Sequence, residues 1–321
     1  MLAVISITNR CNMMCKMCDI GQKNFESAGL TKNLLEVQKE LTVEEWDKAL
    51  DKLKVNEVHI VGVEPLLYKD FDLLIKTIKK NRMLHLITNG LLVDKYFDTI
   101  RKYFNLVTIS VDGLKESHDK IRGIKGSFEK SDLALDNLKK LNRRVRVSFA
   151  ITPDNTKDII SFYNYFNKKK IEIIFNHYNF IHPDVSKKYT CGSTNFSYYN
   201  PLDVDIRDVH KAILNCKNSS WLPNLKSFEE LEKYYRTIST CKKPGSCKVF
   251  NDQVLSKRVI ISSDGSFIPG NRCWYTKPMG NILDMKLLPK DTQWIKDEMI
   301  KFKREGLPEP CHRLCCAGKI L

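Results

Sequence analysis

The sequence predicts an α/β fold: a partial (β/α)6 barrel of the TIM type, followed by a small cysteine-rich C-terminal domain. Six apolar segments of strand length alternate with helical segments over residues 1–180, as in a parallel sheet with helical crossovers. We interpret these strands as apolar on both faces, as a sheet covered by helices requires. The alternation stops near residue 180, and eight of the eleven cysteines lie beyond residue 190. A complete barrel needs eight units, so six units predict an open one.

The predicted elements follow one another in a regular order. The expected strands are residues 2–8, 56–62, 83–90, 106–113, 144–152 and 171–178. The expected helices are residues 41–53, 71–80, 93–104, 127–141 and 156–168. Thr42 and Glu45 have the spacing of a capping box at the start of the first helix. The apolar face of that helix is expected to consist of Val43, Trp46, Leu50 and Leu53.

Two further regions follow the barrel. Residues 181–240 mix loop-like and helical patterns, so we expect a connecting region that faces the substrate. Residues 241–321 combine short strand patterns with clustered cysteines, which predicts a separate small domain. The expected domains are therefore residues 1–180, 181–240 and 241–321. Functional side chains are expected at the C-terminal ends of the barrel strands.

Composition narrows the class of protein. The 321 residues are 42% hydrophobic and 28% charged, an ordinary globular balance. No apolar run approaches the roughly 18 residues of a membrane span, and the N-terminus lacks the features of a signal peptide, so we expect a cytoplasmic protein without a membrane contact. The net charge is +15, but the basic pairs are scattered. We interpret such pairs as solvated helix faces. The alternative is that the positive charge attracts an anionic substrate or a nucleic acid. A nucleic-acid partner is not expected, because its binding site would cluster basic residues with aromatic ones.

The first strand runs into a loop that carries three cysteines, Cys11, Cys15 and Cys18, in the sequence TNRCNMMCKMC. In a reducing compartment, eleven cysteines favour metal binding over disulfides. A 4Fe–4S cube needs a ligand at each of its irons, so three thiolates would leave one iron open to a small molecule. From spacing alone, a zinc site with a distant fourth ligand, or inert buried thiols, are the alternatives.

This CxxxCxxC spacing resembles the signature of the radical S-adenosylmethionine (SAM) superfamily. The resemblance implies that the amino and carboxylate groups of SAM chelate the open iron. It also implies that the reduced cluster cleaves SAM to methionine and a 5′-deoxyadenosyl radical, which abstracts a hydrogen atom from the substrate. An external electron donor of the flavodoxin or ferredoxin type is implied as well.

Motifs at the next strand ends extend the resemblance. GVEP resembles the family's GGEP, with Glu64 as the carboxylate that holds the SAM ammonium and Val63 in place of the second glycine. SVDG followed by HDKIRG resembles a subgroup with auxiliary clusters, in which Ser110 and Arg122 match residues that contact the SAM carboxylate. Arginine suits a bidentate grip on a carboxylate. The residues expected to contact SAM are Met17, Gly62, Val63, Glu64, Pro65, Asn89, Ser110, Asp112 and Arg122.

The C-terminal cysteines resemble the auxiliary domains of that subgroup, called SPASM when they hold two clusters and twitch when they hold one. The longer two-cluster tail pattern is absent, which favours one auxiliary 4Fe–4S cluster, with zinc in the same ligands as the alternative. Its expected ligands are Cys247, Cys273, Cys311 and Cys315, with Cys316 as the first substitute. Three further cysteines are expected to be free thiols, one of which could donate a hydrogen atom: Cys191, Cys216 and Cys241.

The expected reaction is the dehydrogenation or epimerisation of a small polar metabolite, such as a sugar or an aminocyclitol. Transfer of an electron from the substrate radical to the auxiliary cluster would give dehydrogenation, and return of hydrogen from a thiol to the opposite face would give epimerisation. The chain begins on the first strand without a peptide-recognition domain, which favours a small molecule over the alternative of a peptide-modifying maturase. From another class, a zinc-bearing RNA-binding protein would explain the charge and the cysteines, but not the strand-end motifs.

Overall fold

The computed structural model describes residues 1–18, 39–141, 144–177, 201–222, 224–240, 258–269 and 280–284. These residues form a ten-stranded sheet in the order β10-β9-β8-β1-β2-β3-β4-β5-β6-β7. Strands β1 to β7 pair in parallel, β8 pairs in parallel with β1, and β9 and β10 are antiparallel. The strands are β1 Leu2–Ser6, β2 Glu57–Val61, β3 Met83–Thr88, β4 Leu106–Ser110, β5 Arg144–Ala150, β6 Glu172–Asn176, β7 Ser219–Leu222, β8 Arg258–Ile261, β9 Ser266–Pro269 and β10 Gly280–Asn281.

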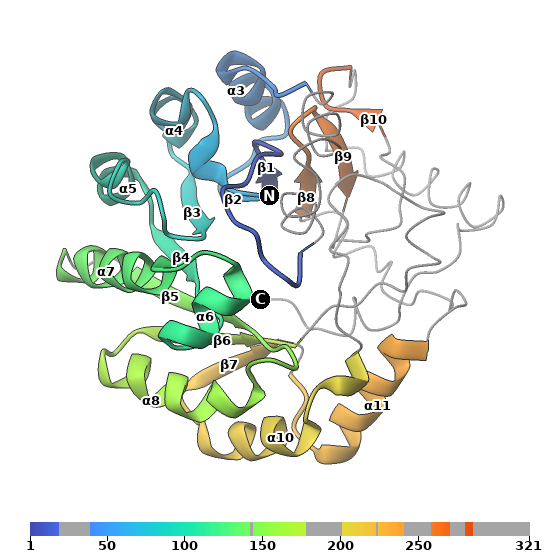
Figure 1. The fold of residues 1–321 in the computed structure, drawn as a ribbon. Helices are drawn as coiled ribbons and strands as arrows, with labels where there is room; N and C mark the ends of the chain where they lie inside the picture. Colours follow the sequence, from blue (N-terminus) through green and yellow to red (C-terminus); the bar gives the residue numbers. More distant parts are fainter. Residues whose placement is uncertain are drawn as a thin grey trace, which may run out of the picture.

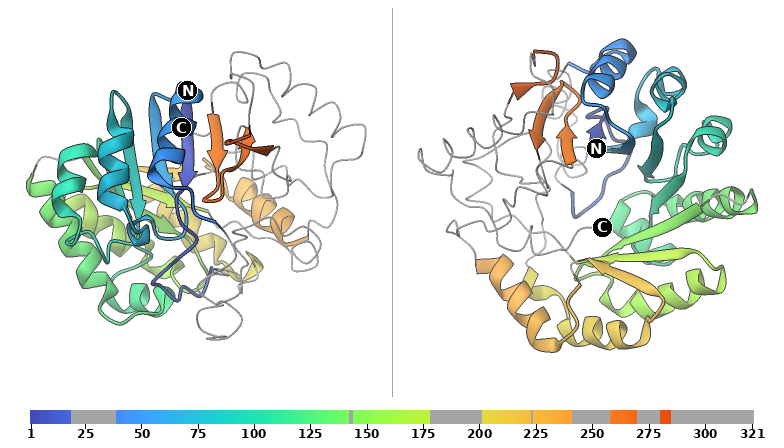
Figure 2. Two further views of the ribbon diagram at one scale, coloured as in Figure 1. Left: turned by 90° about the horizontal axis from the view of Figure 1, so that it is seen from above. Right: turned by 180° about the vertical axis from the view of Figure 1, so that it is seen from behind.

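Helices cover the outside of the curved sheet. Figure 1 shows the strands as an arc with helices around its outer side, and α6 closer to the centre of the arc. Figure 2 shows the same layering from two other directions. The helices are α3 Val43–Lys52, α4 Phe71–Lys79, α5 Phe97–Tyr103, α6 Lys115–Arg122, α7 Ser127–Lys140, α8 Ile159–Lys168, α10 Ile206–Asn215 and α11 Phe228–Thr240, with the 3₁₀ turns η1 Pro65–Leu67, η2 Thr156–Asp158 and η3 Pro201–Asp203. In the part of the chain that is described, no helix combines the length and apolarity needed to cross a membrane.

The predicted α/β partial barrel is confirmed, and the structure adds two parallel strands to it. β7 and β8 have four residues each, too few for a periodic pattern to distinguish them from loops. Among the described strands, the order ends at β7 on one side and β10 on the other, so the sheet that they form is open. The predicted capping box is also present, because Thr42 Oγ1 accepts from the Glu45 N–H at 3.2 Å while Glu45 Oε2 accepts from the Thr42 N–H at 2.8 Å.

The inner face of the barrel is more polar than the sequence interpretation allowed. Side chains on a strand point alternately to opposite faces. On β5, Val145 and Val147 belong to the apolar core between sheet and helices, whereas Arg144, Arg146 and Ser148 line a cavity inside the arc. The expectation that the strands are apolar on both faces is therefore wrong for this inner face. Alternation of polar and apolar residues in RVRVS was the signal that could have shown it.

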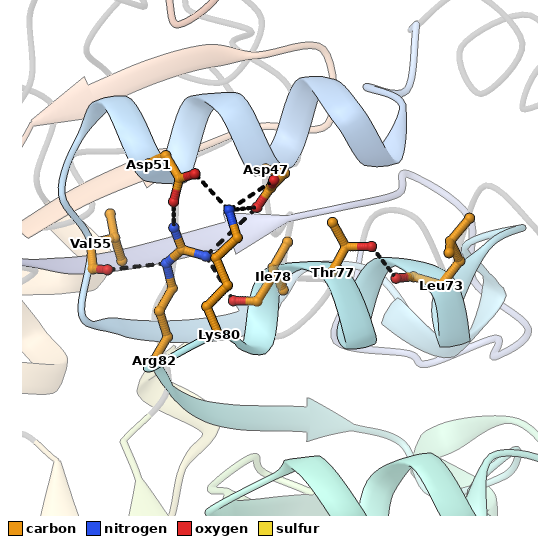
Figure 3. Close-up of polar contacts among 8 residues, drawn as sticks. All are labelled: Asp47, Asp51, Val55, Leu73, Thr77, Ile78, Lys80 and Arg82. Carbon is orange, nitrogen blue, oxygen red and sulfur yellow. Dashed lines mark hydrogen bonds and ion pairs between the residues drawn. The ribbon is translucent and has the colours of Figure 1, made fainter.

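A buried arginine fixes α3 and α4 to the start of β3. Arg82 is 5% exposed and donates to the carbonyl oxygens of Val55 (3.1 Å) and Ile78 (2.8 Å) and to the carboxylate of Asp51. Lys80 adds an ion pair with Asp51 at 2.6 Å on the exposed side. Figure 3 shows the two cations converging on the carboxylates of α3. The guanidinium thereby satisfies carbonyl groups where a helix and a loop end, which a lysine could not do with the same geometry.

Candidate functional site

The loop with the three cysteines follows β1 and is anchored on the end of α6. The backbone N–H of Met14 donates to the carbonyl of Arg122 at 3.2 Å, and that of Lys16 to the carbonyl of Ile121 at 2.9 Å. The last carbonyls of a helix have no partner within the helix, so the loop supplies one. These bonds hold the cysteine loop against the helix that ends in Arg122.

Gly123 permits this close contact. It ends α6 in the left-handed conformation, with φ of +74°, and a Cβ atom there would collide with the carbonyl oxygen of Met14. Glycine adopts this conformation at little cost and has no side chain to collide. The HDKIRG motif includes this glycine, but its role depends on a contact with a distant segment, which the pattern does not show.

The three thiols lie at different depths. Cys15 is buried, while Cys11 and Cys18 are partly exposed. Desolvation by burial raises the pKa of Cys11 to about 12 and that of Cys15 to about 11, although the Arg122 guanidinium opposes the shift at Cys15. The thiolate is the form that ligates metal, so a cationic centre is needed to hold these sulfurs deprotonated.

The loop offers thiolate ligands of the kind that a cluster uses. Within the described ranges, no three Cys, His, Asp or Glu side chains converge on a point that could hold one ion. Zinc needs its ligands about 2.0–2.3 Å from a single centre, whereas each thiolate of a 4Fe–4S cube binds a different iron. Three cysteine sulfurs in one loop would supply three of the four ligands of such a cube.

Arg122 reaches from the end of α6 to the cysteine loop. Its Nε pairs with Asp112 Oδ2 at 2.6 Å, and its Nη1 lies 3.9 Å from the sulfur of Cys15. Desolvation acts against the charged form, but Asp112 and Cys15 outweigh it and raise the pKa of Arg122 above its usual value. The structure thus brings together Cys15, Asp112 and Arg122, which the sequence predicted for one site.

Asp112 is itself held on several sides. It is fully buried, its Oδ1 accepts from the Ala150 N–H at 2.7 Å, and its carbonyl accepts from the Asn155 side chain at 3.0 Å. Its N–H donates to His118 Nδ1 at 3.1 Å, and burial lowers the pKa of His118 to about 3. His118 is therefore neutral, with Nδ1 as the acceptor. The sequence did not indicate a role for Asn155, in the turn before η2, or for His118, inside α6, because each is a single residue without a motif of its own.

Glu64 is fully buried and ties the end of β2 to the end of β3. Its carboxylate accepts from Thr88 Oγ1 at 2.7 Å, from the Asn89 N–H at 2.8 Å and from the Leu66 N–H at 3.1 Å. Desolvation raises the pKa of Glu64, against the effect of these bonds. An ammonium group bound by Glu64, as the sequence predicts, would therefore share the carboxylate with three protein donors.

The neighbours of Glu64 connect it to the cysteine loop. The Glu64 N–H donates to the carbonyl of Arg10 at 3.0 Å, and Asn89 Nδ2 donates to Asn12 Oδ1 at 2.8 Å. Arg10 and Asn12 flank Cys11 in sequence. The loop is therefore fixed from β2 and β3 on one side and from α6 on the other.

Gly62 has a second close approach of the same kind. Its φ is +118°, and a Cβ atom there would collide with the side chain of Ser6 at the end of β1. Val63 is half-buried, and Pro65 begins η1 with Glu64 as its N-cap. The GVEP segment is thus shaped by the close approach at Gly62 and by the cap that Glu64 provides.

The remaining predicted residues lie at different distances from this centre. Ser110 ends β4, where it is half-buried and in register with Ser148 of β5. Met17 is partly buried against the apolar core, as expected for a space-filling thioether. Cys216 follows α10 and is 1% exposed in that core. This position does not support the prediction that Cys216 donates hydrogen to a substrate in the barrel.

Seven other predicted cysteines lie outside the described residues: Cys191, Cys241, Cys247, Cys273, Cys311, Cys315 and Cys316.

The chain is similar in sequence to members of a known protein family. The family model of the Radical SAM superfamily matches residues 5–166. Over 183 residues, the chain is 30% identical to Fe-coproporphyrin III synthase of Methanosarcina barkeri, which covers 55% of this chain and 43% of that protein. Over 161 residues, it is 28% identical to the sporulation killing factor maturation protein SkfB of Bacillus subtilis, which covers 48% of this chain and 37% of that protein. The chain spans less than half the length of these two curated relatives.

A solved structure extends the likeness in fold beyond the barrel. SuiB of Streptococcus suis, bound to the precursor peptide SuiA, superposes with a TM-score of 0.65 at 15% identity over 95% of this chain and 66% of that chain. At this identity the likeness concerns the fold alone.

Proposed function

The chain belongs to the radical SAM superfamily, a family of enzymes that bind a 4Fe–4S cluster and SAM, and we propose that Cys11, Cys15 and Cys18 hold that cluster. The observation that carries the proposal is the contact between the cysteine loop and the end of α6, which brings the Arg122 guanidinium 3.9 Å from the Cys15 sulfur. A cluster at this loop supplies, when bound and reduced, the electron that cleaves SAM to a 5′-deoxyadenosyl radical.

Arg122 is proposed to orient the carboxylate of SAM. Its Nε edge is fixed by Asp112 at 2.6 Å, and this sets the direction in which the rest of the planar guanidinium points. A guanidinium held in this way loses little freedom when it takes up a carboxylate. Asp112 is then a positioning residue, which acts through Arg122.

The side of the loop facing β2 and β3 is proposed to hold the amino end of SAM. Glu64 supplies a buried negative charge there, and Asn89 supplies polar contacts while it holds Asn12. Because the Glu64 oxygens already accept protein hydrogen bonds, an ammonium group would share an anion that is fixed in place. Ser110, Gly62, Val63, Pro65 and Met17 complete the proposed surroundings of SAM.

The substrate half of the reaction is a separate proposal. We expect dehydrogenation or epimerisation of a small polar metabolite, with one auxiliary 4Fe–4S cluster on Cys247, Cys273, Cys311 and Cys315, or Cys316 in its place, and with an external flavodoxin or ferredoxin-type donor. For an epimerase, Cys216 is the weakest of the three candidate hydrogen donors, because it is 1% exposed in the apolar core. Peptide modification is the second candidate, because SuiB, bound to a precursor peptide, shares the fold over 95% of this chain.

Iron content and SAM cleavage test the proposal together. Wild type purified without oxygen should hold about eight irons per chain and, when reduced, release 5′-deoxyadenosine from SAM. The variant Cys11→Ala/Cys15→Ala/Cys18→Ala should hold about four irons and release none. Cys216→Ala, as a buried cysteine outside the loop, is the matched control and should behave as wild type. SAM cleavage by the triple variant would rule out the proposed cluster ligands, and one zinc with no iron in that variant would rule out an auxiliary iron–sulfur cluster.

A further inference from the structure

The inner side of the barrel contains a cavity that the proposed SAM site does not use. It has a volume of about 490 Å³. Its lining begins at the N-terminal ends of the strands and extends toward their C-terminal ends as far as Ser148 and Asn176. Asn176 Nδ2 donates to Ser148 Oγ at 2.7 Å. Ser148 is in register with Ser110, one of the residues proposed to surround SAM. The cavity therefore connects the floor of the barrel with the level of the SAM site.

The floor of this cavity is positively charged. Arg144, Arg146 and Arg258 line it, together with the carboxylate of Glu57. Glu172 pairs with Arg146 at 2.5 Å and with Arg144 at 3.3 Å. Three guanidinium groups and two carboxylates leave one excess positive charge among the described residues of the floor.

The imidazoles of the floor do not change this balance at neutral pH. His59 bonds to Glu57 at 2.7 Å, and His85 bonds to Thr108 Oγ1 at 2.8 Å. Desolvation by burial lowers the pKa of both histidines, to about 3 for His85, so His85 is neutral and presents a neutral hydrogen-bonding edge.

Arg146 is the most buried of the three arginines. It is 7% exposed, and within the described residues its Nε is a buried donor without a hydrogen-bond partner. Buried donors are normally satisfied, and one that is not calls for a ligand, water or ion. Arg146 also lines the cavity, and a largely buried guanidinium beside a cavity with excess positive charge is suited to an oxyanion.

We propose that the floor of the barrel cavity binds an anionic group, a carboxylate or a phosphate, at one end of an elongated substrate. Arg146 lies in register with Thr108, two residues below Ser110, and Arg258 lies in register with Leu2, four residues below Ser6. At about 3.3 Å per residue, the bound group would lie roughly 7–13 Å below the strand ends where SAM is proposed to bind. The reacting C–H bond of the substrate would be separated from its anionic group by about that distance. The assignment of the occupant as a substrate rests on the proposed function, whereas the anion site itself does not.

Anion binding to the full-length, cluster-loaded protein tests this inference. Inorganic phosphate and acetate serve as the two probes, each titrated calorimetrically at constant ionic strength in chloride. Wild type should bind at least one of them saturably. Binding of phosphate alone would indicate a phosphate site, and binding of acetate would indicate a site that accepts a carboxylate. Arg146→Gln and Arg258→Gln should each weaken binding about 10- to 100-fold, as expected for a lost charge-assisted hydrogen bond. Arg258→Lys, which keeps the charge, should weaken it less.

Matched variants make the outcome decisive. Arg101→Gln removes an exposed guanidinium on α5 that pairs with Asp98 and should leave anion binding unchanged. If Arg146→Gln fails to fold, Arg144→Gln, at a side chain that is 64% exposed, should still weaken binding. Absence of saturable binding in wild type, or full binding in the Arg146→Gln/Arg258→Gln double variant, overturns the inference. Failure of wild type to cleave SAM would instead overturn the proposed function and leave the anion result standing.

Discussion

Removing one charge of the Arg122–Asp112 pair should destabilise the protein far more than an exposed ion pair would. Asp112 is fully buried and Arg122 is 12% exposed. Asp112→Asn keeps the side-chain volume and the acceptor for the Ala150 N–H, but leaves Arg122 as a buried cation. Breaking a buried pair typically costs about 3–5 kcal/mol. We expect the low end, about 3 kcal/mol of unfolding free energy, because Arg122 keeps some solvent and its contact with Cys15.

The opposite variant and the double variant complete a cycle. Arg122→Met leaves Asp112 as a buried anion and should also cost about 3 kcal/mol. Asp112→Asn/Arg122→Met removes both charges, so it should cost about 3 kcal/mol rather than the sum of the two single variants. The coupling energy should therefore have a magnitude of about 3 kcal/mol.

Urea unfolding of the reduced, cluster-free protein, followed by circular dichroism, measures all four members of the cycle. The exposed pair of Asp98 and Arg101 at 2.7 Å provides the matched cycle Asp98→Asn and Arg101→Met, whose coupling should stay below about 1 kcal/mol. Single-variant effects that add within about 0.5 kcal/mol at Asp112 and Arg122 would refute the reasoning. In that case Arg122 would not depend on Asp112 for its position.

Three further predictions concern other parts of the structure. Gly123→Ala should lower the iron content of anaerobically purified protein, because the added Cβ would displace the Met14 backbone. The control is Gly126→Ala, at a left-handed glycine whose added Cβ would lie 3.9 Å from its nearest neighbour, and this variant should keep its iron. Equal iron content in the two variants would contradict the anchoring role of Gly123. Arg82→Met should lower the unfolding free energy by about 3 kcal/mol, because it leaves the Val55 and Ile78 carbonyls without their donor. Lys80→Ala, at an exposed ion pair, should lower the urea midpoint far less; similar midpoints for the two variants would disprove this. Burial lowers the pKa of His177 to about 3, below its value of about 6.5 in the unfolded chain. The neutral form of His177 therefore contributes fully to the unfolding free energy above pH 6.5, and this contribution is lost as the pH falls toward 3. The urea midpoint of wild type should therefore fall between pH 7 and pH 4.5 more steeply than that of His177→Phe, and parallel slopes would exclude the effect.

The sequence predicted the parts of the fold that depend on local periodicity. The capping box of Thr42 and Glu45, and the alternation that gives β1 to β6, are local signals, and the structure confirms them. β8 could not be predicted in this way, because its place beside β1 depends on pairing with a strand at the other end of the chain. Pairing of this kind is a tertiary effect, which single-segment patterns do not record.

The candidate site shows the same division. Cys11, Cys15, Cys18, Asp112 and Arg122 could be selected because their residue types and spacing carry chemistry. Their supports could not, because the roles of Gly123 and Asn12 come from contacts between segments that are distant in the sequence. The role of His118 depends on the direction of its side chain toward the Asp112 N–H, which the residue type alone does not show. The alternation of polar and apolar residues in RVRVS indicates a polar inner face, which the prediction of strands apolar on both faces did not include.

The position of β8 has a consequence for how the chain folds. β1 is synthesised long before β8, yet one of its edges pairs with Arg258–Ile261. Ser263, just after β8, receives hydrogen bonds from Asn9 (2.6 Å) and from the Leu41 N–H (2.7 Å). Until that strand leaves the ribosome, the edge of β1 is open, and an apolar edge strand is a template for pairing with other chains. Pairing over such a sequence separation is also slow, because a long loop must close before the contact forms. A fragment that ends before Arg258 should therefore aggregate even though it contains every residue of the proposed SAM site.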